Sequence, residues 1–543
     1  MNPRYNYSRR RSSQALAGNV TIGGDAPIRL QSMTNTSTLD TEGSAAQAMR
    51  IAEAGGEIVR LTTQGEREAR NMAPIRALLR EKGCGVPLVA DVHFNPKAAF
   101  AAAEVTDKVR INPGNFVDPG RTFVKLEFTD EEYAAEIEKI RRTLVPFLEV
   151  CKAHGTCVRL GVNHGSLSDR IMSRYGDTPE GMVESVMEFL RVCEKENFHN
   201  IVISIKASNT TVMVRTVRLL VKEMEREGMS YPLHLGVTEA GDGEDGRVKS
   251  AVGIGTLLSE GIGDTIRVSL SEDPEVEIPV ARRLRDYITA REDHSPVKEP
   301  EEIPSGESRL KAVRTSNIKE WPFVVGYDVA EVPSGWHHAD AALDEPVPYG
   351  DTEPVVLTTS HVNIPGSVAA WIDRFVGAGG RNPVVVSLSY DDVDDIEELQ
   401  VRAGADFGAL LLNGYASGIE IRARHFDPAT LHRLALGILQ AARLRMTRTE
   451  YIACPSCGRT LFDLQKTLAE VREATSHLKG LKIGVMGCIV NGPGEMADAD
   501  YGYVGAGPGR VSIYKGKTLV TKNIPAEEAL PALLALIESD RQE

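Results

Sequence analysis

Long apolar runs are missing from this chain of 543 residues. Because no stretch reaches 18 apolar residues, we expect no membrane-spanning helix. Aromatic residues are also scarce, at 6%, whereas glycines number 49, a balance that fits aliphatic α/β layers better than an aromatic-rich β-sandwich. Positive charge is in deficit, since the formal net charge is −14. We therefore expect neither a membrane nor a nucleic acid as partner, and a small anionic ligand would need positive charge gathered locally.

Cysteine is sparse as well. The chain has seven cysteines, a number that is odd and too small for a disulfide framework. This count predicts a reducing, cytoplasmic location. The first 24 residues lack Asp and Glu, as transit peptides do, but residues 15–24 read as a hairpin, so we interpret the N-terminus as part of the mature protein. Four cysteines lie in apolar surroundings and are predicted to be buried free thiols: Cys84, Cys151, Cys157 and Cys193.

Short β-branched runs alternate with helical stretches from residue 28 to about residue 270. Eight such runs are present, at residues 28–33, 58–62, 87–91, 108–112, 157–162, 200–205, 232–237 and 264–269. Thr129 and Glu132 predict the start of a long helix that ends at Gly155. Eight strand–helix units of this length predict a (β/α)8 TIM-type barrel. The competing doubly wound sheet would usually show a Gly-rich first turn, which the sequence lacks.

The composition changes after the predicted barrel. Residues 296–354 hold 8 of the 28 prolines and mark a boundary. Beyond it, residues 354–358, 383–388 and 408–412 read as buried strands and residues 431–446 as an amphipathic helix. The last hundred residues contain three cysteines, a Gly-rich β segment at 501–509 and a helix at 526–537. We therefore predict a barrel domain at 1–290, an inserted smaller α/β domain at 291–445 and an α+β domain at 446–543.

The strongest local signal is Cys454-Pro-Ser-Cys457, followed by Cys488. The first two cysteines share a loop that precedes an amphipathic segment, so we expect them at a helix N-terminus, where the dipole favours thiolate. Three cysteines without a nearby His are an incomplete set for structural zinc. A [4Fe–4S] cluster usually takes four, so three leave one iron for another ligand, and Glu495 is the candidate. We favour this cluster over a zinc ribbon lacking a ligand or a redox pair with an unrelated third cysteine.

A second signal lies at the C-terminal ends of the eight predicted strands, the face of a barrel that carries active sites. The polar residues there are Arg60, Asp91, His93, Arg110, Asn112, Arg159, Asn163, Lys206, Thr238, Glu239, Arg267 and Ser269. Four Arg and one Lys with few carboxylates predict a ligand with several negative charges, and guanidinium groups suit phosphate or diphosphate. Any single one of them would more often be a strand-end ion pair. Glu239 reads either as an acid/base group or as a counter-ion of Arg267.

Six segments resemble those of the 4-hydroxy-3-methylbut-2-enyl diphosphate synthase family, the iron–sulfur enzymes of the methylerythritol phosphate route to isoprenoids. They are Gln31–Asn35, Asp91–Asn95, Val109–Asn115, Arg159–Asn163, Cys454–Thr460 and Gly487–Glu495. The resemblance covers residues 8–290 and 446–543. It implies reductive ring opening and dehydroxylation of 2-C-methyl-D-erythritol 2,4-cyclodiphosphate to 4-hydroxy-3-methylbut-2-enyl diphosphate.

The resemblance also assigns roles to single residues. It implies a [4Fe–4S] cluster on Cys454, Cys457, Cys488 and Glu495. Diphosphate contacts would come from Arg60, Arg110, Arg159, Lys206, Arg267 and Ser269. Other polar contacts would come from Asp91, His93, Asn112, Asn163, Thr238 and Glu239, with Glu239 and Glu495 as the proton-handling candidates.

Partners and assembly follow from the resemblance too. It implies ferredoxin or flavodoxin as electron donor and a homodimer as the assembly. The inserted domain resembles that of the long form of the family, where it acts as a spacer. Whether the cluster domain closes on its own barrel or on a partner's stays open. A zinc-dependent barrel transferase or lyase and a cluster-bearing redox sensor are the alternatives from other functional classes.

Overall fold

The computed structural model describes residues 2–118, 127–304, 320–489, 492–496 and 498–542. The chain divides into two compact units. One unit comprises Arg11–Gly243, Gly263–Ala281 and Arg448–Glu543, and the other comprises Met1–Arg10, Glu244–Ile262 and Arg282–Thr447. The domain limits expected from the sequence, 1–290, 291–445 and 446–543, stay a prediction. Within the described ranges, no helix is long and apolar enough to cross a membrane.

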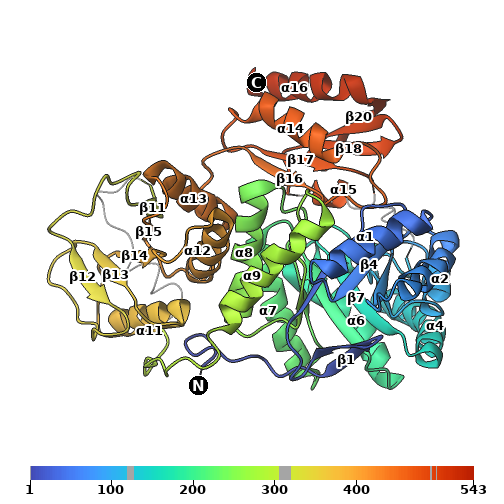
Figure 1. Ribbon diagram of the computed structural model, residues 1–543, viewed down its shortest axis with the longest axis horizontal. Coiled ribbons are helices and arrows are strands. Elements are labelled where there is room, and N and C mark those ends of the chain that lie inside the picture. The colour runs from blue at the N-terminus through green and yellow to red at the C-terminus, as the bar shows by residue number, and fades with distance from the viewer. Residues whose placement is uncertain (1, 119–126, 305–319, 490–491, 497, 543) are drawn as a thin grey trace. The chain divides into compact units, whose positions relative to one another are not determined.

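Eight parallel strands form a barrel in the first unit (Figure 1). They are β3 (Arg29–Met33), β4 (Ile58–Thr63), β5 (Leu88–Val92), β6 (Lys108–Ile111), β7 (Cys157–Asn163), β8 (Ile201–Lys206), β9 (His234–Leu235) and β10 (Thr265–Ile266). Their order is β8-β7-β6-β5-β4-β3-β10-β9, and a parallel bridge between Ile203 and Leu233 closes the ring. All eight predicted runs form strands, which confirms the barrel.

Helices follow the strands in chain order. They are α1 (Thr41–Glu53), α2 (Glu66–Glu81), α3 (Pro96–Ala103), α4 (Asp130–His154), α5 (Asp169–Tyr175), α6 (Pro179–Lys195), α7 (Thr210–Arg226), α8 (Gly243–Ser259) and α9 (Glu277–Thr289), with a 3-10 turn at Pro274–Val276. Helix α4 begins with a capping box in which Thr129 and Glu132 each accept from the other's backbone N–H. It ends at Gly155, whose φ of 67° is the left-handed conformation that glycine adopts without strain. The predicted start and stop of this helix are therefore confirmed.

The N-terminal hairpin closes the end of the barrel where the strands begin. Its strands are β1 (Gln14–Ala17) and β2 (Val20–Gly23), as residues 15–24 predicted. Ala15, Ala17 and Ile22 of the hairpin share one buried apolar cluster with Ile58, Val89, Cys157 and Val202 of the barrel strands. Burying such side chains stabilises the fold by about 1.5–3 kcal/mol for each larger aliphatic residue. The hairpin thereby covers this end of the barrel with apolar side chains.

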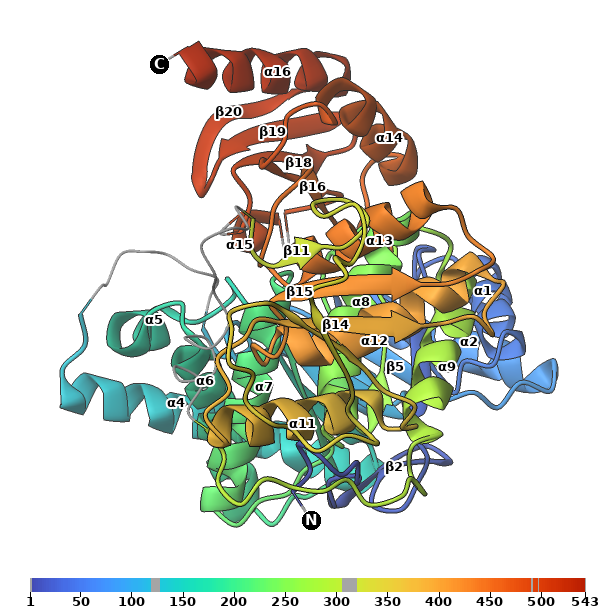
Figure 2. The same ribbon diagram turned by 90° about the vertical axis from the view of Figure 1, so that its left-hand side faces the viewer.

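The same unit contains a second sheet at the C-terminal end of the chain. Its strands, in spatial order, are β16 (Glu450–Ala453), β17 (Lys482–Met486), β18 (Tyr501–Gly507), β19 (Arg510–Lys515) and β20 (Thr518–Pro525). Helices α14 (Leu464–Thr475) and α16 (Ala526–Gln542) pack in one apolar core against one face of this sheet (Figure 2). The short helix α15 (Gly492–Glu495) leads to Met496, which packs against the other face. The strands and helices predicted for this region are confirmed.

The other unit is built around a wholly parallel sheet. Its strands are β11 (Phe323–Val324), β15 (Gly418–Arg422), β14 (Val384–Ser389), β13 (Val355–Thr358) and β12 (His337–Asp340) in spatial order, and its helices include α11 (Ile364–Gly377), α12 (Ile396–Leu411) and α13 (Pro428–Ala441). The strand predicted at 408–412 is wrong, because those residues end α12. Asp395 caps this helix, and a Cβ on Gly408 would lie 2.8 Å from the Cα of Val252 in α8. The small apolar residues that looked like a buried strand serve close helix–helix packing.

Candidate active site

A pocket at the C-terminal ends of the barrel strands is lined by residues of both the barrel and the C-terminal sheet domain. The barrel contributes Met33, Arg60, Asp91, His93, Arg110, Arg159, Asn163, Lys206, Thr238, Glu239, Arg267 and Ser269. The C-terminal domain contributes Cys454, Pro455, Cys457, Arg459, Thr460, Met486 and Cys488. Fourteen of the sixteen site residues predicted from the sequence are therefore brought together, and Asn112 and Glu495 are the two that do not line the pocket.

Strand register explains why the barrel residues converge. Asp91 of β5 pairs with Arg110 of β6, and Arg110 pairs with Arg159 of β7. One strand further on, Asn163 pairs with Lys206. Residues paired across neighbouring strands point to the same face of a sheet, which here is the interior of the barrel. Because side chains alternate between the two faces of each strand, these charged residues all point into the interior of the barrel.

The lining carries a strong excess of positive charge. Its six cations are Arg60, Arg110, Arg159, Lys206, Arg267 and Arg459, and its two carboxylates are Asp91 and Glu239, so the sum is +6 − 2 = +4 in a chain of net charge −14. Burial, and then the neighbouring Arg60 and Arg159, hold the pKa of Lys206 well below its usual value. Burial lowers the pKa of Arg60 to about 10. Mutual repulsion of this kind is relieved by a bound polyanion.

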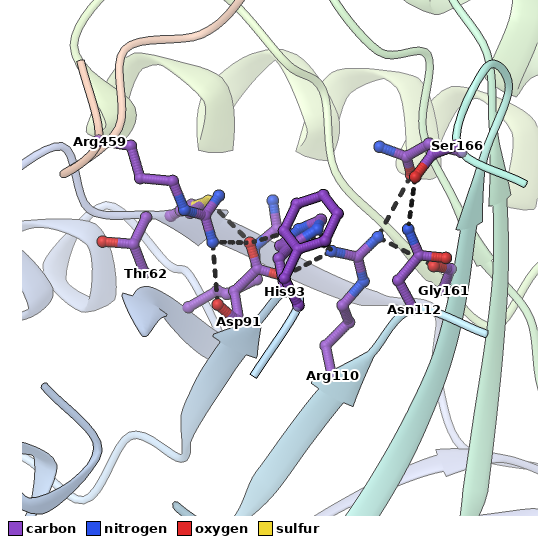
Figure 3. A network of polar contacts seen from close by, with 12 residues as sticks. Thr62, Asp91, His93, Arg110, Asn112, Gly161, Ser166 and Arg459 are labelled. Carbon is purple, nitrogen blue, oxygen red and sulfur yellow. Dashed lines mark hydrogen bonds and ion pairs between the residues drawn. The ribbon is translucent and has the colours of Figure 1, made fainter. Parts of the chain in front are cut away.

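Asp91 is the centre of the polar network (Figure 3). Its Oδ1 accepts from Arg110 Nη1 at 3.1 Å, and its Oδ2 accepts from Arg459 Nη2 at 3.2 Å. Arg159 Nη2 lies 4.0 Å from Oδ1. Burial alone would raise the pKa of Asp91, but these guanidinium groups hold it well below the usual range. The carboxylate is therefore ionised and shared among several cations.

His93 follows β5 and lies against Arg110, whose Nη1 contacts the imidazole Nε2. Burial and the charge of Arg110 lower the pKa of His93 to about 3, although Asp91 opposes the shift. The imidazole is therefore neutral at pH 7 and cannot contribute a positive charge to the pocket. It can still accept or donate one hydrogen bond, as the sequence predicted for a substrate contact.

Arg267 already has a carboxylate partner below the pocket. Its Nε and Nη2 donate to Glu277 Oε2 and Oε1 at 2.9 and 2.8 Å, and Ser32 Oγ donates to the same carboxylate at 2.6 Å. Burial lowers the pKa of Arg267, but Glu277 more than offsets this and the pKa is raised. Glu277 is the first residue of α9 and does not follow a predicted strand. The search for polar residues at strand ends therefore missed this ion pair.

The three cysteines reach the pocket from two loops of the C-terminal domain. Cys454 and Cys457 follow β16, Cys488 follows β17, and the N–H of Gly487 donates to Cys454 Sγ at 3.2 Å. The expected position at a helix N-terminus is wrong, because α14 begins only at Leu464. Burial, followed by the charges of Glu239 and Cys457, raises the pKa of Cys454 well above its usual value. Thiolates here need an added positive charge to be stable.

Asn112 and Glu495 are not part of the pocket lining. Asn112 Nδ2 donates to Ser166 Oγ at 2.9 Å, and its Oδ1 accepts from the N–H of Gly114 at 3.0 Å, so this side chain organises the loop after β6. Glu495 ends α15 and is buried. Two residues of its predicted Gly-rich turn, 490 and 491, lie outside the described residues. The roles of both residues as contacts or ligands stay predictions.

Contacts outside the pocket also join the barrel and the C-terminal domain within one chain. Ala240 and Ala453 form a parallel bridge, and Ser271 Oγ donates to the carbonyl of Cys454 at 3.1 Å. Ser208 Oγ donates to Asp498 Oδ2 at 2.8 Å. One chain can therefore supply both halves of the pocket, and whether a partner's domain can take this place stays a question for the assembled protein.

Sequence reasoning missed five lining residues, Met33, Pro455, Arg459, Thr460 and Met486. Arg459 and Thr460 belong to the motif that follows Cys457, so their proximity to the thiols was visible in the sequence. Their contact with the barrel was not, because Asp91 lies 368 residues away in the chain. Met33 ends β3, and its sulfur lies 3.1 Å from Arg60 Nε. An apolar strand-end residue gave no chemical signal.

Comparison with known proteins identifies the family. A family model described as the GcpE TIM-barrel domain matches residues 12–282, and one described as the GcpE protein C-terminal domain matches residues 450–539. The 4-hydroxy-3-methylbut-2-en-1-yl diphosphate synthase (flavodoxin) of Parabacteroides distasonis is 54% identical over 99% of this chain and 99% of its own. The chain belongs to the 4-hydroxy-3-methylbut-2-enyl diphosphate synthase family.

A plant member of this family is similar over nearly the whole chain. The 4-hydroxy-3-methylbut-2-en-1-yl diphosphate synthase (ferredoxin), chloroplastic, of Oryza sativa subsp. japonica is 39% identical over 98% of this chain and 87% of its own. Both relatives therefore extend across the inserted domain, as the long form does. Membership confirms the resemblance and makes the chain an oxidoreductase of the methylerythritol phosphate pathway, in a family that uses an iron–sulfur cluster.

Proposed function

We propose that the pocket binds 2-C-methyl-D-erythritol 2,4-cyclodiphosphate and that the chain converts it to 4-hydroxy-3-methylbut-2-enyl diphosphate. The observation that carries this proposal is the lining with its net charge of +4 beside three cysteines. A cyclic diphosphate offers the several negative charges that this lining requires, and its oxygens match guanidinium donors. Arg60, Arg110, Arg159, Lys206, Arg267 and Ser269 are the proposed diphosphate contacts.

We further propose that a [4Fe–4S] cluster binds to Cys454, Cys457 and Cys488 of this pocket, with Glu495, which is buried but does not line the pocket, as the fourth ligand. Cysteines from two loops line one space, and a backbone N–H already points at one sulfur. The positive charge of iron would offset the repulsion that raises the pKa of Cys454. In the described part of the chain, no three His, Cys, Asp or Glu residues are grouped so as to hold a single metal ion. The fit therefore rests on the shared pocket and on the donor set.

A bound cluster would supply two electrons, one at a time, as the C–O bond to phosphate breaks and a hydroxyl leaves as water. The protein's own residues bind the diphosphate and must deliver a proton to the leaving hydroxyl. Glu239 is the candidate for this role, because it lines the pocket, is buried, and acts electrostatically on both Arg267 and Cys454. Its φ of 50° is unusual for a residue other than glycine, a geometry found where function requires it. Asp91, His93, Asn112, Asn163 and Thr238 are the other proposed polar contacts.

Partners and assembly complete the proposal. Relatives are named for flavodoxin or ferredoxin, and we propose one of these proteins as the electron donor. A cytoplasmic homodimer and a spacer role for the inserted domain stay part of the proposal. The described lining of the pocket comes from one chain.

The test is an iron and labile-sulfide assay on protein purified without oxygen, combined with turnover of the cyclic diphosphate. We expect four iron and four sulfide per chain, on the order of one [4Fe–4S] cluster, and formation of the open-chain product with a chemical or protein reductant. Protein that carries no sulfide, or that carries it and never consumes the cyclic diphosphate, would contradict the proposal.

A further inference from the structure

Arg459 joins the loop of the cysteines to the floor of the barrel pocket. Its Nη2 donates to the backbone carbonyl of Asp91 at 2.9 Å and to the carboxylate of the same residue at 3.2 Å (Figure 3). The side chains of Arg459 and Asp91 are only 7% and 5% exposed. Separating a buried ion pair removes a counter-charge from each partner, and Arg459 would lose the carboxylate that it contacts here. This pair is therefore strong only when the C-terminal domain lies against the barrel.

The loop that carries Arg459 is shaped for this close approach. A Cβ on Gly458 would lie 2.4 Å from the carbonyl oxygen of Thr36 and 2.6 Å from Thr62 Oγ1. Any larger residue would therefore hold the loop away from the barrel. The guanidinium of Arg459 lines the same pocket as the three cysteines and the barrel cations.

Asp91 divides its negative charge among several cations. Its carboxylate faces Arg110 at 3.1 Å and Arg159 at 4.0 Å in addition to Arg459. A diphosphate that engages Arg110 and Arg159 would compete with Asp91 for them and add negative charge nearby. Both effects make the contact between Asp91 and Arg459 more favourable. By thermodynamic linkage, the closed contact must favour diphosphate by the same factor.

We infer that Arg459 is a positioning residue that couples diphosphate binding to closure of the C-terminal domain on the barrel, by way of Asp91. The inference rests on the proposed function in one respect, the binding of a diphosphate in this pocket. It adds a role for a residue outside the proposed ligands of the cluster and the substrate. Its consequence is that the cysteine loops are held over the barrel most firmly when substrate is present.

Hydrogen exchange on protein purified without oxygen tests this coupling, with inorganic pyrophosphate as the probe. We expect pyrophosphate to slow exchange of residues 455–461 in the unaltered protein. In Arg459→Gln this slowing should be lost and the Kd for pyrophosphate should rise about tenfold, within the usual range of coupling between sites. Arg459→Lys keeps the charge but has a single ammonium donor group, so it should fall between the two.

A matched control comes from Arg472, whose Nη1 lies 3.3 Å from Asp242 Oδ2 in a contact between the same domains outside the pocket lining. Arg472→Gln should leave the effect of pyrophosphate on residues 455–461 unchanged. Gly458→Ala, which keeps Arg459, should reduce that effect as Arg459→Gln does.

A double-mutant cycle identifies the route of the coupling. If Arg459 acts by way of Asp91, the double variant with Asp91→Asn and Arg459→Gln should have a Kd for pyrophosphate no higher than the higher Kd of the two single variants. Additive losses would overturn the inference. Tight binding of pyrophosphate without a change in hydrogen exchange at residues 455–461 would also overturn the inference, but it would leave the proposed function intact. Failure of pyrophosphate to bind at all would overturn both.

Discussion

Two buried arginines of the same pocket should respond in opposite ways to replacement by Gln. Among the described residues, Arg159 Nε and Nη1 have no hydrogen-bond partner, and Nη2 lies 4.0 Å from Asp91 Oδ1. Burial, and then Arg60 and Arg110, hold the pKa of Arg159 well below its usual value. Its charge is therefore costly in the pocket until an anion compensates it. Arg267, in contrast, is held by Glu277 through two hydrogen bonds.

The magnitudes follow from these contacts. Arg159→Gln should weaken diphosphate binding by about 1.5–3 kcal/mol, the scale of hydrogen bonds to charged groups, or about 10–150-fold in Kd. It should leave stability unchanged or slightly improved, because a poorly compensated buried cation is removed. Arg267→Gln leaves Glu277 buried without its cation, at a cost of about 3–5 kcal/mol in the free energy of unfolding. Its effect on binding should be smaller than that of Arg159→Gln.

Calorimetric titration with inorganic pyrophosphate measures the first effect, and urea unfolding followed at fixed pH measures the second. Arg267→Gln combined with Glu277→Gln is the control, because it removes the unpaired carboxylate and should recover most of the lost stability. If Arg159→Gln bound pyrophosphate like the unaltered protein, the assignment of the diphosphate site would be refuted. If Arg267→Gln were fully stable, the reasoning from buried charge would fail.

Three further outcomes test other parts of the site. Glu495→Ala should keep most of the brown colour and sulfide of the protein but lose turnover, and unchanged turnover would exclude Glu495 as the fourth ligand. The pKa of His164 is raised, since Asp498 and Asp177 outweigh the lowering by burial and Lys517. Its contribution is therefore complete below about pH 6.5, its unfolded pKa, and is lost as pH rises through the folded pKa. The melting temperature of the unaltered protein relative to His164→Gln should thus decline from pH 6 to pH 9, and a flat difference would contradict this. In the protein loaded with its cluster, Cys84 should react with a thiol reagent before Cys151, Cys157 and Cys193, because only Cys84 of these four is partly exposed. Equal reaction rates for all four cysteines would show that burial does not protect the other three.

Much of the barrel could be predicted because its signals are local. The start of α4 depends on Thr129 and Glu132, three residues apart, and its end depends on Gly155. Each strand of the barrel is short, β-branched and bounded by turns, so eight of them define the fold without any knowledge of their neighbours. The polar strand ends then converge by topology alone, because the carboxyl ends of parallel strands meet on one face.

Where neighbours decide the structure, the sequence misled. The run at 408–412 is apolar and short, and periodicity alone does not distinguish a buried strand from a buried helix. Its Gly408 packs against Val252 of α8, and these two residues are 156 positions apart in the chain. The expected thiolate-stabilising helix N-terminus failed for a related reason. Helix α14 begins only at Leu464, and Cys454 is buried near Glu239, which lies more than 200 residues earlier in the chain.

The pairing of charges is the part of the site that only the folded chain reveals. From the sequence, Arg110, Arg159 and Arg267 were equivalent cations at strand ends. In the structure, Arg110 shares Asp91 with other cations, and Arg267 is paired with Glu277. Arg159 has no hydrogen-bonded carboxylate among the described residues. Substrate can only compensate charges that the protein has left uncompensated. Differences in partner, and not residue type, should therefore determine which arginines bind diphosphate and which hold the barrel together.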